Sequence, residues 1–311
     1  MDRATLEAMG INFTAGLDRT PVPPTPAYDS PSVYFEVDQA IEEVEQAAII
    51  GDLSAVKVTL AMLRAISPRN DGALLQPGSS LLFAIENGHE QVVGFLFSER
   101  VTLGDSHVKL ATNKRNIPIL ASLLQHGWKI NDELAWATPP ALAFAIEDLE
   151  LTTWFLAHGA DPMARCLSGL SPFNVAMQFA PFPVIEMLFA HGASVNASDT
   201  LVHAVRRDAG DQVNLLNHLL DRGGRSVINE LMYEKIPLAY QLQKWFALGT
   251  PLHEAGEHGK LDVAKLLVGN GADFRIKDSL GETALERARR NKHDEVVHYL
   301  QQLNRKPTSQ L

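Results

Sequence analysis

Glycine recurs along this chain at an interval that indicates a repeating structural unit. Gly127, Gly159 and Gly192 are separated by 32 and 33 positions. Gly271 begins a Gly-Ala-Asp triplet of the same kind as the one at Gly159. A glycine at such a point suits the left-handed backbone conformation that closes a helix. A period of this length is typical of repeat proteins, in which each unit packs only on its neighbours.

Between these glycines, apolar residues fall in short runs with the spacing of amphipathic helices. The clearest runs are Ile119, Leu120, Leu123 and Leu124; Val184, Ile185, Met187 and Leu188; Val263, Leu266 and Leu267; and Val296, Val297 and Leu300. Each run covers only a few turns, and an isolated helix of that length is marginal in water. We therefore expect the helices to be stable only when stacked on neighbours that bury their apolar stripes.

One segment carries a family resemblance. It begins Thr250-Pro251-Leu252-His253, where threonine caps a helix and proline occupies its first turn, and it continues to Gly271-Ala272-Asp273 and Gly281. This segment resembles a nearly complete ankyrin repeat. Similar copies lie at Ser79 to Asp105, 138–166 and 169–199, and poorer ones near 40–66, 106–134, 200–224 and 282–304. The resemblance implies an all-α ankyrin-repeat solenoid of about eight stacked helix–turn–helix repeats.

We divide the chain into three parts. Residues 1–37 form a Pro-rich N-terminal leader, 38–305 the solenoid and 306–311 a C-terminal tail. The prolines predict an extended leader, which either straps along the first repeat or offers a P-x-x-P ligand. Between the sixth and seventh repeats, an insertion at about 225–249 contains Tyr233, Trp245 and Phe246. This apolar content predicts helical structure that packs on the stack or roofs part of it.

Composition limits the classes of partner. The net charge of −10 disfavours phosphate backbones and anionic membrane surfaces. A basic cluster, Arg287 to Lys292, is more simply the polar outer face of a terminal repeat. The single cysteine, Cys166, and the lack of a signal peptide or an apolar stretch of bilayer length favour a soluble protein of the cytoplasm, with the nucleus possible. We expect no nucleic acid and no membrane partner.

No recognisable catalytic motif is present. His253 and His258 suggest a zinc-protease helix, but they are five positions apart and do not share a helical face. The resemblance instead implies that His253 is a buried histidine that bonds between repeats. His158 and His191 precede helix-closing glycines, where a cation favours the helix end. The sequence therefore predicts no metal and no cofactor, and leaves enzymatic activity open.

The resemblance implies that the ends of the first helices and the turn tips before them line a concave face. When the repeats are aligned in this way, acidic, basic and aromatic residues alternate along the concave face. Such a mixture is typical of a recognition patch. An ordinary solvated face with variable residues is the alternative. The candidate binding residues are Glu86, Asp132, Glu133, Trp136, Glu147, Asp148, Arg165, Phe179, Arg206 and Arg207. In addition, the prolines around Phe182 predict that its side chain points outward.

Two functions remain. The first is an interaction module that binds a protein partner through its concave groove. The second is a small-molecule binder or atypical enzyme with a pocket in the irregular central repeats. For that pocket the candidate walls are Trp128, Trp136, Phe144, Trp154 and Phe155, which otherwise fill the core between repeats. Its candidate acid, base and anion-binding groups are Asp132, Glu133, Glu147, Asp148, His203 and Arg206.

Overall fold

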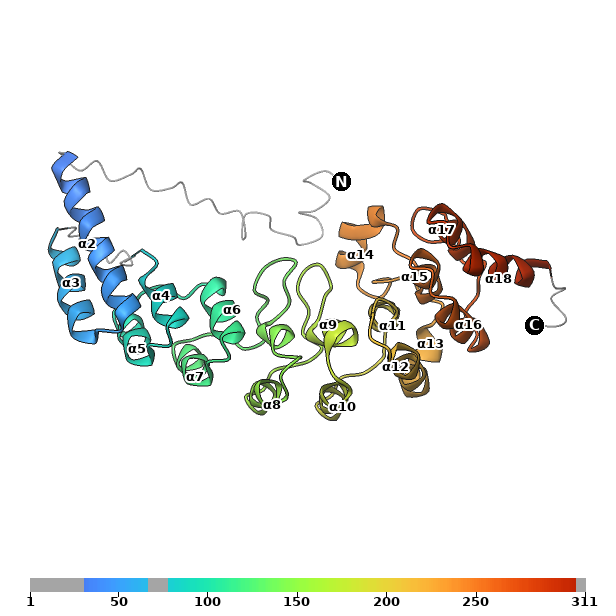
Figure 1. Ribbon diagram of the computed structural model, residues 1–311, viewed down its shortest axis with the longest axis horizontal. Coiled ribbons are helices and arrows are strands. Elements are labelled where there is room, and N and C mark those ends of the chain that lie inside the picture. The colour runs from blue at the N-terminus through green and yellow to red at the C-terminus, as the bar shows by residue number, and fades with distance from the viewer. Residues whose placement is uncertain (1–30, 67–77, 306–311) are drawn as a thin grey trace.

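The computed structural model describes residues 31–66 and 78–305. In these ranges the chain is helical, and its only strand-like pairing consists of two isolated bridges, Ala135 with Thr138 and Lys277 with Thr283. Short helices run back and forth and stack side by side into an arch (Figure 1). The all-α repeat solenoid predicted from the sequence is confirmed.

The helices alternate between two rows. We call the first row the inner helices: α2 (Pro31–Ile50), α4 (Ser80–Glu86), α6 (Asp105–Asn113), the 3-10 helix η1 (Ala141–Phe144), α9 (Pro172–Phe179), α11 (Ser198–Val205), α15 (Pro251–Glu257) and α17 (Ala284–Arg290). We call the second row the outer helices: α3 (Leu53–Ile66), α5 (Glu90–Ser98), α7 (Ile117–Gln125), α8 (Leu149–Ala157), α10 (Phe182–Ala190), α12 (Gln212–Leu219), α16 (Leu261–Gly269) and α18 (Asp294–Arg305).

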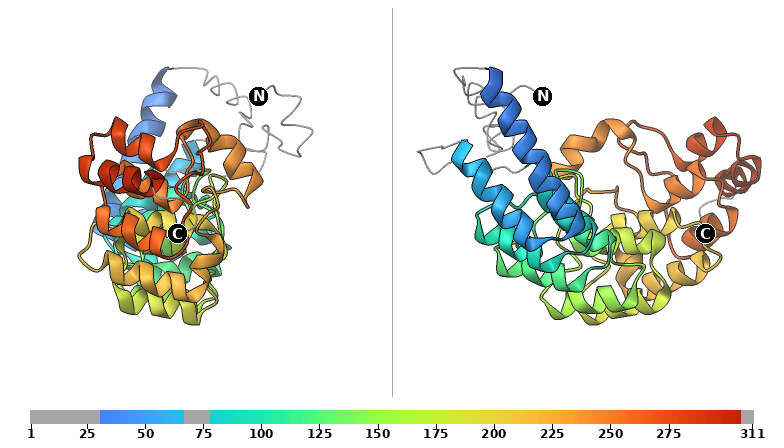
Figure 2. Two further views of the ribbon diagram at one scale, coloured as in Figure 1. Left: turned by 90° about the vertical axis from the view of Figure 1, so that its right-hand side faces the viewer. Right: turned by 60° about the vertical axis from the view of Figure 1, so that its left-hand side comes forward.

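Each inner helix contacts the inner helix of the next repeat, so the first row is continuous from α2 to α17. Turns that connect an outer helix to the next inner helix rise on the opposite side from α8 and α10, and the rows curve into an arch (Figures 1 and 2). The side chains between the rows form one apolar core that extends from Ala40 to Leu303. Burial between neighbours therefore stabilises helices that are too short to persist alone.

A glycine and a histidine interlock successive repeats. Gly259 has φ +67°, and a Cβ there would lie 2.5 Å from Nδ1 of His293 in the following repeat. The ring of His293 then donates from Nε2 to the carbonyl oxygen of Glu257 over 2.9 Å. His89 packs over Gly51 in the same way and bonds to the carbonyl oxygen of Ile49 over 2.9 Å. The missing side chain of glycine thus makes room for the link that joins two repeats.

The outer helices end as the glycine spacing predicts. Gly127, Gly159 and Gly192 all have φ between +86° and +98°, which is the left-handed conformation. The residue before each of them is a histidine. His158 places Nδ1 2.7 Å from the carbonyl oxygen of Trp154, and His126 and His191 repeat the contact one turn back in their own helices. Each histidine ring thus adds a second donor to a carbonyl group of the last turn that already accepts from the backbone amide of the same histidine.

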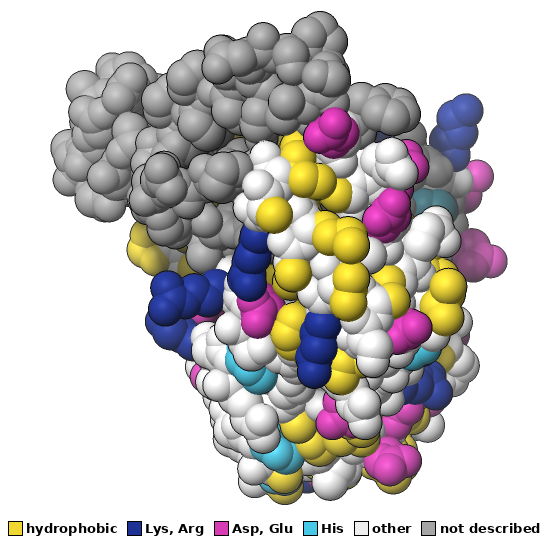
Figure 3. Space-filling model, turned by 90° about the vertical axis from the view of Figure 1, so that its left-hand side faces the viewer, with side chains coloured by type: hydrophobic (Ala, Val, Ile, Leu, Met, Phe, Trp, Pro, Cys, Tyr) yellow, Lys and Arg dark blue, Asp and Glu magenta, His cyan; other side chains and the backbone are white. Residues whose placement is uncertain are grey.

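The N-terminal leader differs from its prediction where it is described. Helix α2 begins at Pro31, so the expectation that residues 31–37 are extended is wrong. Proline is compatible with the first helical position because the amide it lacks has no partner there. Residues 1–30 and 306–311 lie outside the described residues, as do the predictions that concern them. The end of the stack formed by α2 and α3 exposes Ile50, Val58 and Met62, and apolar side chains gather on this face (Figure 3).

The insertion between α12 and α15 has the helical structure expected from its sequence. It contains a kinked segment η2 (Leu220–Gly224), α13 (Arg225–Val227), α14 (Pro237–Gln243) and the 3-10 helix η3 (Lys244–Phe246). Met232, Tyr233, Ala239 and Leu248 pack with Val202 of α11 in a small separate core. No described helix is long and apolar enough to cross a membrane.

Candidate functional site

The concave face carries exposed acids in its N-terminal half. Glu86 ends α4 and forms a loose ion pair with Lys114, at 3.6 Å. Asp132 is exposed in the turn before η1. Residues 1–200 contain 11 Lys and Arg against 23 Asp and Glu, whereas residues 201–311 contain 16 against 14. The acidity of the whole chain therefore belongs to its first two thirds.

A hollow of about 360 Å³ lies where α6, η1 and α9 meet, and several predicted residues line it. Phe179, the last residue of α9, is 59% exposed beside it. Asp148 caps α8 by accepting from the amide of Leu151 and also pairs with Arg115 at 3.2 Å. Glu147 is exposed at the rim. The structure thus brings Glu147, Asp148 and Phe179 together.

Trp136 lies at a turn tip and is 63% exposed. Its carbonyl oxygen accepts from the amide of Ser168 in the next turn over 2.9 Å. Glu133, in the same turn, accepts from the amide of Leu167 over 2.6 Å. The two turns therefore hold one another, and the indole is exposed on a fixed backbone. Glu133 has a structural bond that the sequence did not indicate.

The prediction that Arg165 and Arg207 are available to a binding partner is wrong. Arg165 donates to Asp199, whose side chain is fully buried, over 2.7 Å, and also to Asn174. Arg207 is 5% exposed; it donates to Asp211 over 2.6 Å and to the carbonyl oxygen of Ala180. Their guanidinium groups are occupied inside the stack, since a buried charge needs a partner.

Arg206 belongs to an ionic network that crosses three repeats. It caps α11 and donates from Nε to Glu254 of α15 over 2.8 Å. Arg287 of α17 lies 3.5 Å from the same carboxylate and 2.7 Å from Asp278. Burial raises the pKa of Glu254, but hydrogen bonds from His258 and Arg206 outweigh burial and lower that pKa to about 2. Glu254 is therefore ionised at neutral pH.

His203, predicted as an acid or base, is buried behind this network. Its Nδ1 lies 2.5 Å from the amide nitrogen of Gln178, so the amide donates and Nε2 carries the proton. Burial first, and then the charge of Arg206, lowers the pKa of His203 to about 3. A neutral ring that is 3% exposed does not reach a substrate in the groove, so its assignment as a catalytic candidate is corrected.

Most of the candidate pocket aromatics pack between repeats. Trp128, Trp154 and Phe155 join the main core, with Phe155 in edge contact with both indoles. Phe144 is half-buried beside the hollow at α9, and Trp136 is exposed. The first three therefore fill the core between repeats, the alternative that the sequence left open. Phe182 does not point outward: it is half-buried and packs on His218 with ring centroids 5.0 Å apart.

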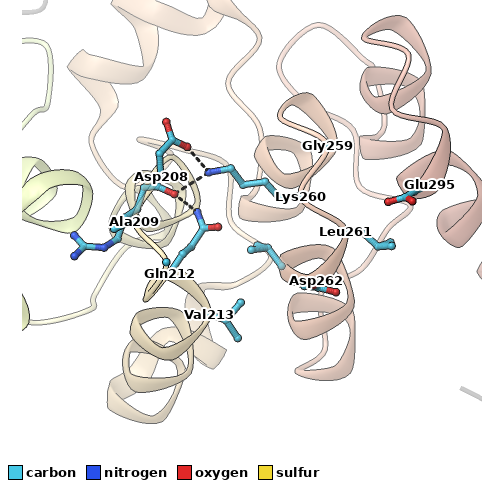
Figure 4. A pocket seen from close by; sticks show the side chains of 12 residues that line it. Asp208, Ala209, Gln212, Val213, Gly259, Lys260, Leu261, Asp262 and Glu295 are labelled. Atoms are coloured by element: carbon cyan, nitrogen blue, oxygen red, sulfur yellow. Dashed lines mark hydrogen bonds and ion pairs between the residues drawn. The ribbon is translucent and has the colours of Figure 1, made fainter.

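A second hollow, of about 530 Å³, lies between the end of α11 and the start of α16 (Figure 4). Lys260 reaches across it and donates to the carbonyl oxygens of Val205 and Arg207 and to Asp208, over 2.8 to 3.0 Å. Lys260 here makes the backbone contact that His89 and His293 make elsewhere. This hollow is a joint between repeats. In the described ranges, no three His, Cys, Asp or Glu side chains are grouped closely enough to hold a metal ion.

Sequence reasoning missed Trp245 and Phe246 as surface residues, although it noted both in the insertion. They are 72% and 78% exposed at the tip η3. It also missed Glu254, which is buried in the inner row. The apolar content of the insertion predicted packing but not which aromatics would pack. Exposure depends on contacts with repeats distant in sequence, and the periodicity contains no signal for those contacts.

The fold and this surface define a repeat scaffold that presents side chains along a concave row of inner helices and turns. Residues 201–310 match the family model for ankyrin repeats in three copies, so this part of the chain consists of ankyrin repeats, as the resemblance implied. Ankyrin repeats are a protein–protein interaction module.

Two curated proteins illustrate this similarity. One is a probable E3 ubiquitin-protein ligase, XBOS33, of Oryza sativa subsp. japonica, 37% identical over 79 residues, which are 25% of this chain and 15% of that protein. The other is cyclin-dependent kinase inhibitor 2A of Monodelphis domestica, 33% identical over 95 residues, which are 28% of this chain and 56% of that protein. The matches thus cover a small part of the first relative and about half of the second.

Proposed function

We propose that this chain is an interaction module that binds a protein partner along its concave face, with Trp136 and Phe179 as its main apolar contacts. The observation that carries the proposal is the exposure of these two rings, 63% and 59%, at positions that the backbone fixes. Trp136 lies in a turn bonded to the next turn, and Phe179 ends an inner helix. Aromatic residues on a rigid surface contribute much of the binding energy in protein interfaces.

Charge on the same face adds a preference. Glu86, Asp132 and Glu147 are exposed on the side of the arch where acids outnumber bases. Opposite charges steer association and suppress wrong partners more than they add affinity. We therefore propose that the segment of the partner that crosses the N-terminal half is basic. Its association rate should fall as salt is raised, because screening shortens the reach of these carboxylates.

Affinity capture from cells that express the protein tests the proposal. The double variant Trp136→Ala, Phe179→Ala should lose a partner that the wild type retains. The matched control is Leu149→Ala, Val213→Ala, because these residues are 50% and 38% exposed on the outer helices α8 and α12. A partner captured by wild type and control but not by the test variant supports the concave face. Equal capture by all three forms would refute it.

A further inference from the structure

The insertion ends in two aromatic side chains that the fold places in solvent. Trp245 and Phe246 are 72% and 78% exposed, although the insertion buries Met232, Tyr233 and Leu248. Large apolar residues are often exposed singly, but two adjacent aromatics at the tip of an otherwise packed element are a distinct feature. The insertion thus buries most of its large apolar residues but exposes Trp245 and Phe246 to solvent.

The backbone around this pair is held from three sides. Ser279 donates from Oγ to the carbonyl oxygen of Lys244 over 2.6 Å, and its Oγ accepts from the amide of Leu248 over 2.8 Å. Gln243 donates to the carbonyl oxygen of Ser168 in another turn. Arg287 donates to the carbonyl oxygen of Ala247.

Ala247 itself has φ +55°, a left-handed conformation that alanine rarely adopts. Such a conformation persists where surrounding contacts impose it. The exposure of Trp245 and Phe246 is therefore a built property of the tip. A rigid aromatic pair loses little conformational entropy when it binds.

A hollow of about 490 Å³ adjoins Phe246, and its walls include Arg206, Phe246, Glu254, Glu257, Arg287 and Arg290. Arg287 is buried there and bound to Asp278, so the guanidinium groups that reach the hollow are those of Arg206 and Arg290. Only Nε of Arg206 is bound to Glu254; for its Nη2 the partner among the described residues is the sulfur of Met232, at 3.9 Å. Arg290 is 47% exposed in its side chain and pairs with Glu257 at 3.1 Å and with Glu282 at 2.8 Å. Arg206 is thus the guanidinium group lining the hollow whose Nη2 is not held by a carboxylate, and an anionic group can reach it there.

We infer that the tip and this hollow form a docking site for a protein segment in which an acidic side chain lies next to a large apolar one. The carboxylate would enter the hollow near Arg206 and Arg290, and the apolar side chain would pack on Trp245 and Phe246. Charge complementarity selects this occupant, because Arg206 is 35% exposed and its Nη2 has no carboxylate partner among the described residues. The inference rests on the proposed interaction function and adds a second contact, of opposite charge preference, to it.

Selection of displayed random peptides on the full-length protein tests the inference. Enriched peptides should contain Asp or Glu beside Phe, Leu or Trp. Synthetic copies should bind the double variant Trp245→Ala, Phe246→Ala at least about tenfold more weakly, the loss typical of removing an interfacial hot spot. Arg290→Gln should weaken binding less, and added salt should weaken it in the wild type. Thermal unfolding should be the same in each variant, since the altered side chains are exposed.

Several outcomes separate this site from the concave face. Val213→Ala is the exposed apolar control and should bind the peptides as the wild type does. The double variant at Trp136 and Phe179 should also retain them. Enrichment of basic peptides, or equal binding to the Trp245 and Phe246 variant, would overturn the inference. So would binding of a synthetic peptide of residues 1–30 at this site, which would assign it to the chain itself. A cellular partner lost only from the Trp136 and Phe179 variant would leave the proposed function standing and contradict this inference.

Discussion

Arg206 donates from Nε to Oε2 of Glu254 over 2.8 Å, and this bond joins the end of α11 to the middle of α15. The long insertion separates the two helices in sequence, yet the bond spans neighbouring inner helices. Arg287 then continues the network to α17 and to the carbonyl oxygen of Ala247 at the tip. The inner row on this side of the arch is therefore stabilised by charge as well as by apolar contact.

A double-mutant cycle measures this link. Glu254→Gln should lower the free energy of unfolding by about 1–3 kcal/mol, because it removes the negative charge that Arg206 and Arg287 share inside the stack. Arg206→Met should cost less, because its side chain is 35% exposed. The coupling energy from urea unfolding should fall within about 0.5–3 kcal/mol. A coupling indistinguishable from zero would mean that the pair does not join the repeats.

Stability should fall on acidification, and buried histidines set the range. Burial lowers the pKa of His203 to about 3 and that of His253 to about 4. Below about pH 6.5 these two histidines are protonated in the unfolded chain but remain neutral in the folded chain. The unfolded state then binds more protons, so stability decreases as pH falls, by at most about 1.4 kcal/mol per pH unit for each histidine. Glu254, with its lowered pKa, adds to the loss below about pH 4.5.

Urea midpoints measured between about pH 7 and pH 4 test this account. The variant His203→Gln retains a polar side chain beside Gln178 but cannot titrate, so its slope against pH should be shallower than that of the wild type. Identical slopes would show that His203 does not contribute.

Three glycines give a graded test of the stacking geometry. Gly259→Ala should be the most harmful, since a Cβ there meets both the left-handed backbone and the ring of His293. Gly271→Ala meets only the backbone penalty, about 1–2 kcal/mol, because the space around it is open. Gly269→Ala, in helix α16 with open space, should be neutral or stabilising by up to about 1 kcal/mol. Thermal unfolding that does not follow this order would contradict the interlock between repeats.

Substitutions at Arg165 and Trp136 should have different effects: the first should lower stability, and the second should leave stability nearly unchanged. Arg165→Met leaves the buried carboxylate of Asp199 with Asn174 as its remaining partner, and breaking a buried pair in this way costs about 3–5 kcal/mol. Trp136→Ala should change stability by less than about 0.5 kcal/mol, as expected for an exposed side chain. Denaturant unfolding of both variants measures these two changes in the free energy of unfolding. A large loss for Trp136→Ala would mean that its indole is structural.

The features of a single repeat were predicted correctly from residues that lie close together in sequence. The glycines at 127, 159 and 192 adopt the left-handed conformation, and Thr250 with Pro251 begins α15. His253 is 1% exposed, accepts from Thr250 and donates to the carbonyl oxygen of Glu282 in the next repeat, as the family resemblance implied. These features depend on residues within one repeat or at a fixed spacing, which a sequence displays directly.

The candidate site was harder to predict, because its properties arise between repeats. Alignment placed Phe179 and Arg206 at helix ends, where they are found. It did not show that Arg165 would meet Asp199, 34 positions later, or that Arg207 would turn inward to Ala180. The orientation of a side chain around a helix end depends on its partner in the next repeat. Pro31 illustrates another limit, since a proline that ends an extended segment also begins a helix well.

Backbone hydrogen exchange on the complex with a captured partner tests the central claim most directly. If the concave face binds, amides near the ends of α9 and α11 and in the turn around Trp136 should exchange more slowly in the complex. The outer helices α8 and α10 should exchange as they do in the free protein. Slowed exchange confined to the outer helices, with the turn around Trp136 unchanged, would contradict binding through the concave face.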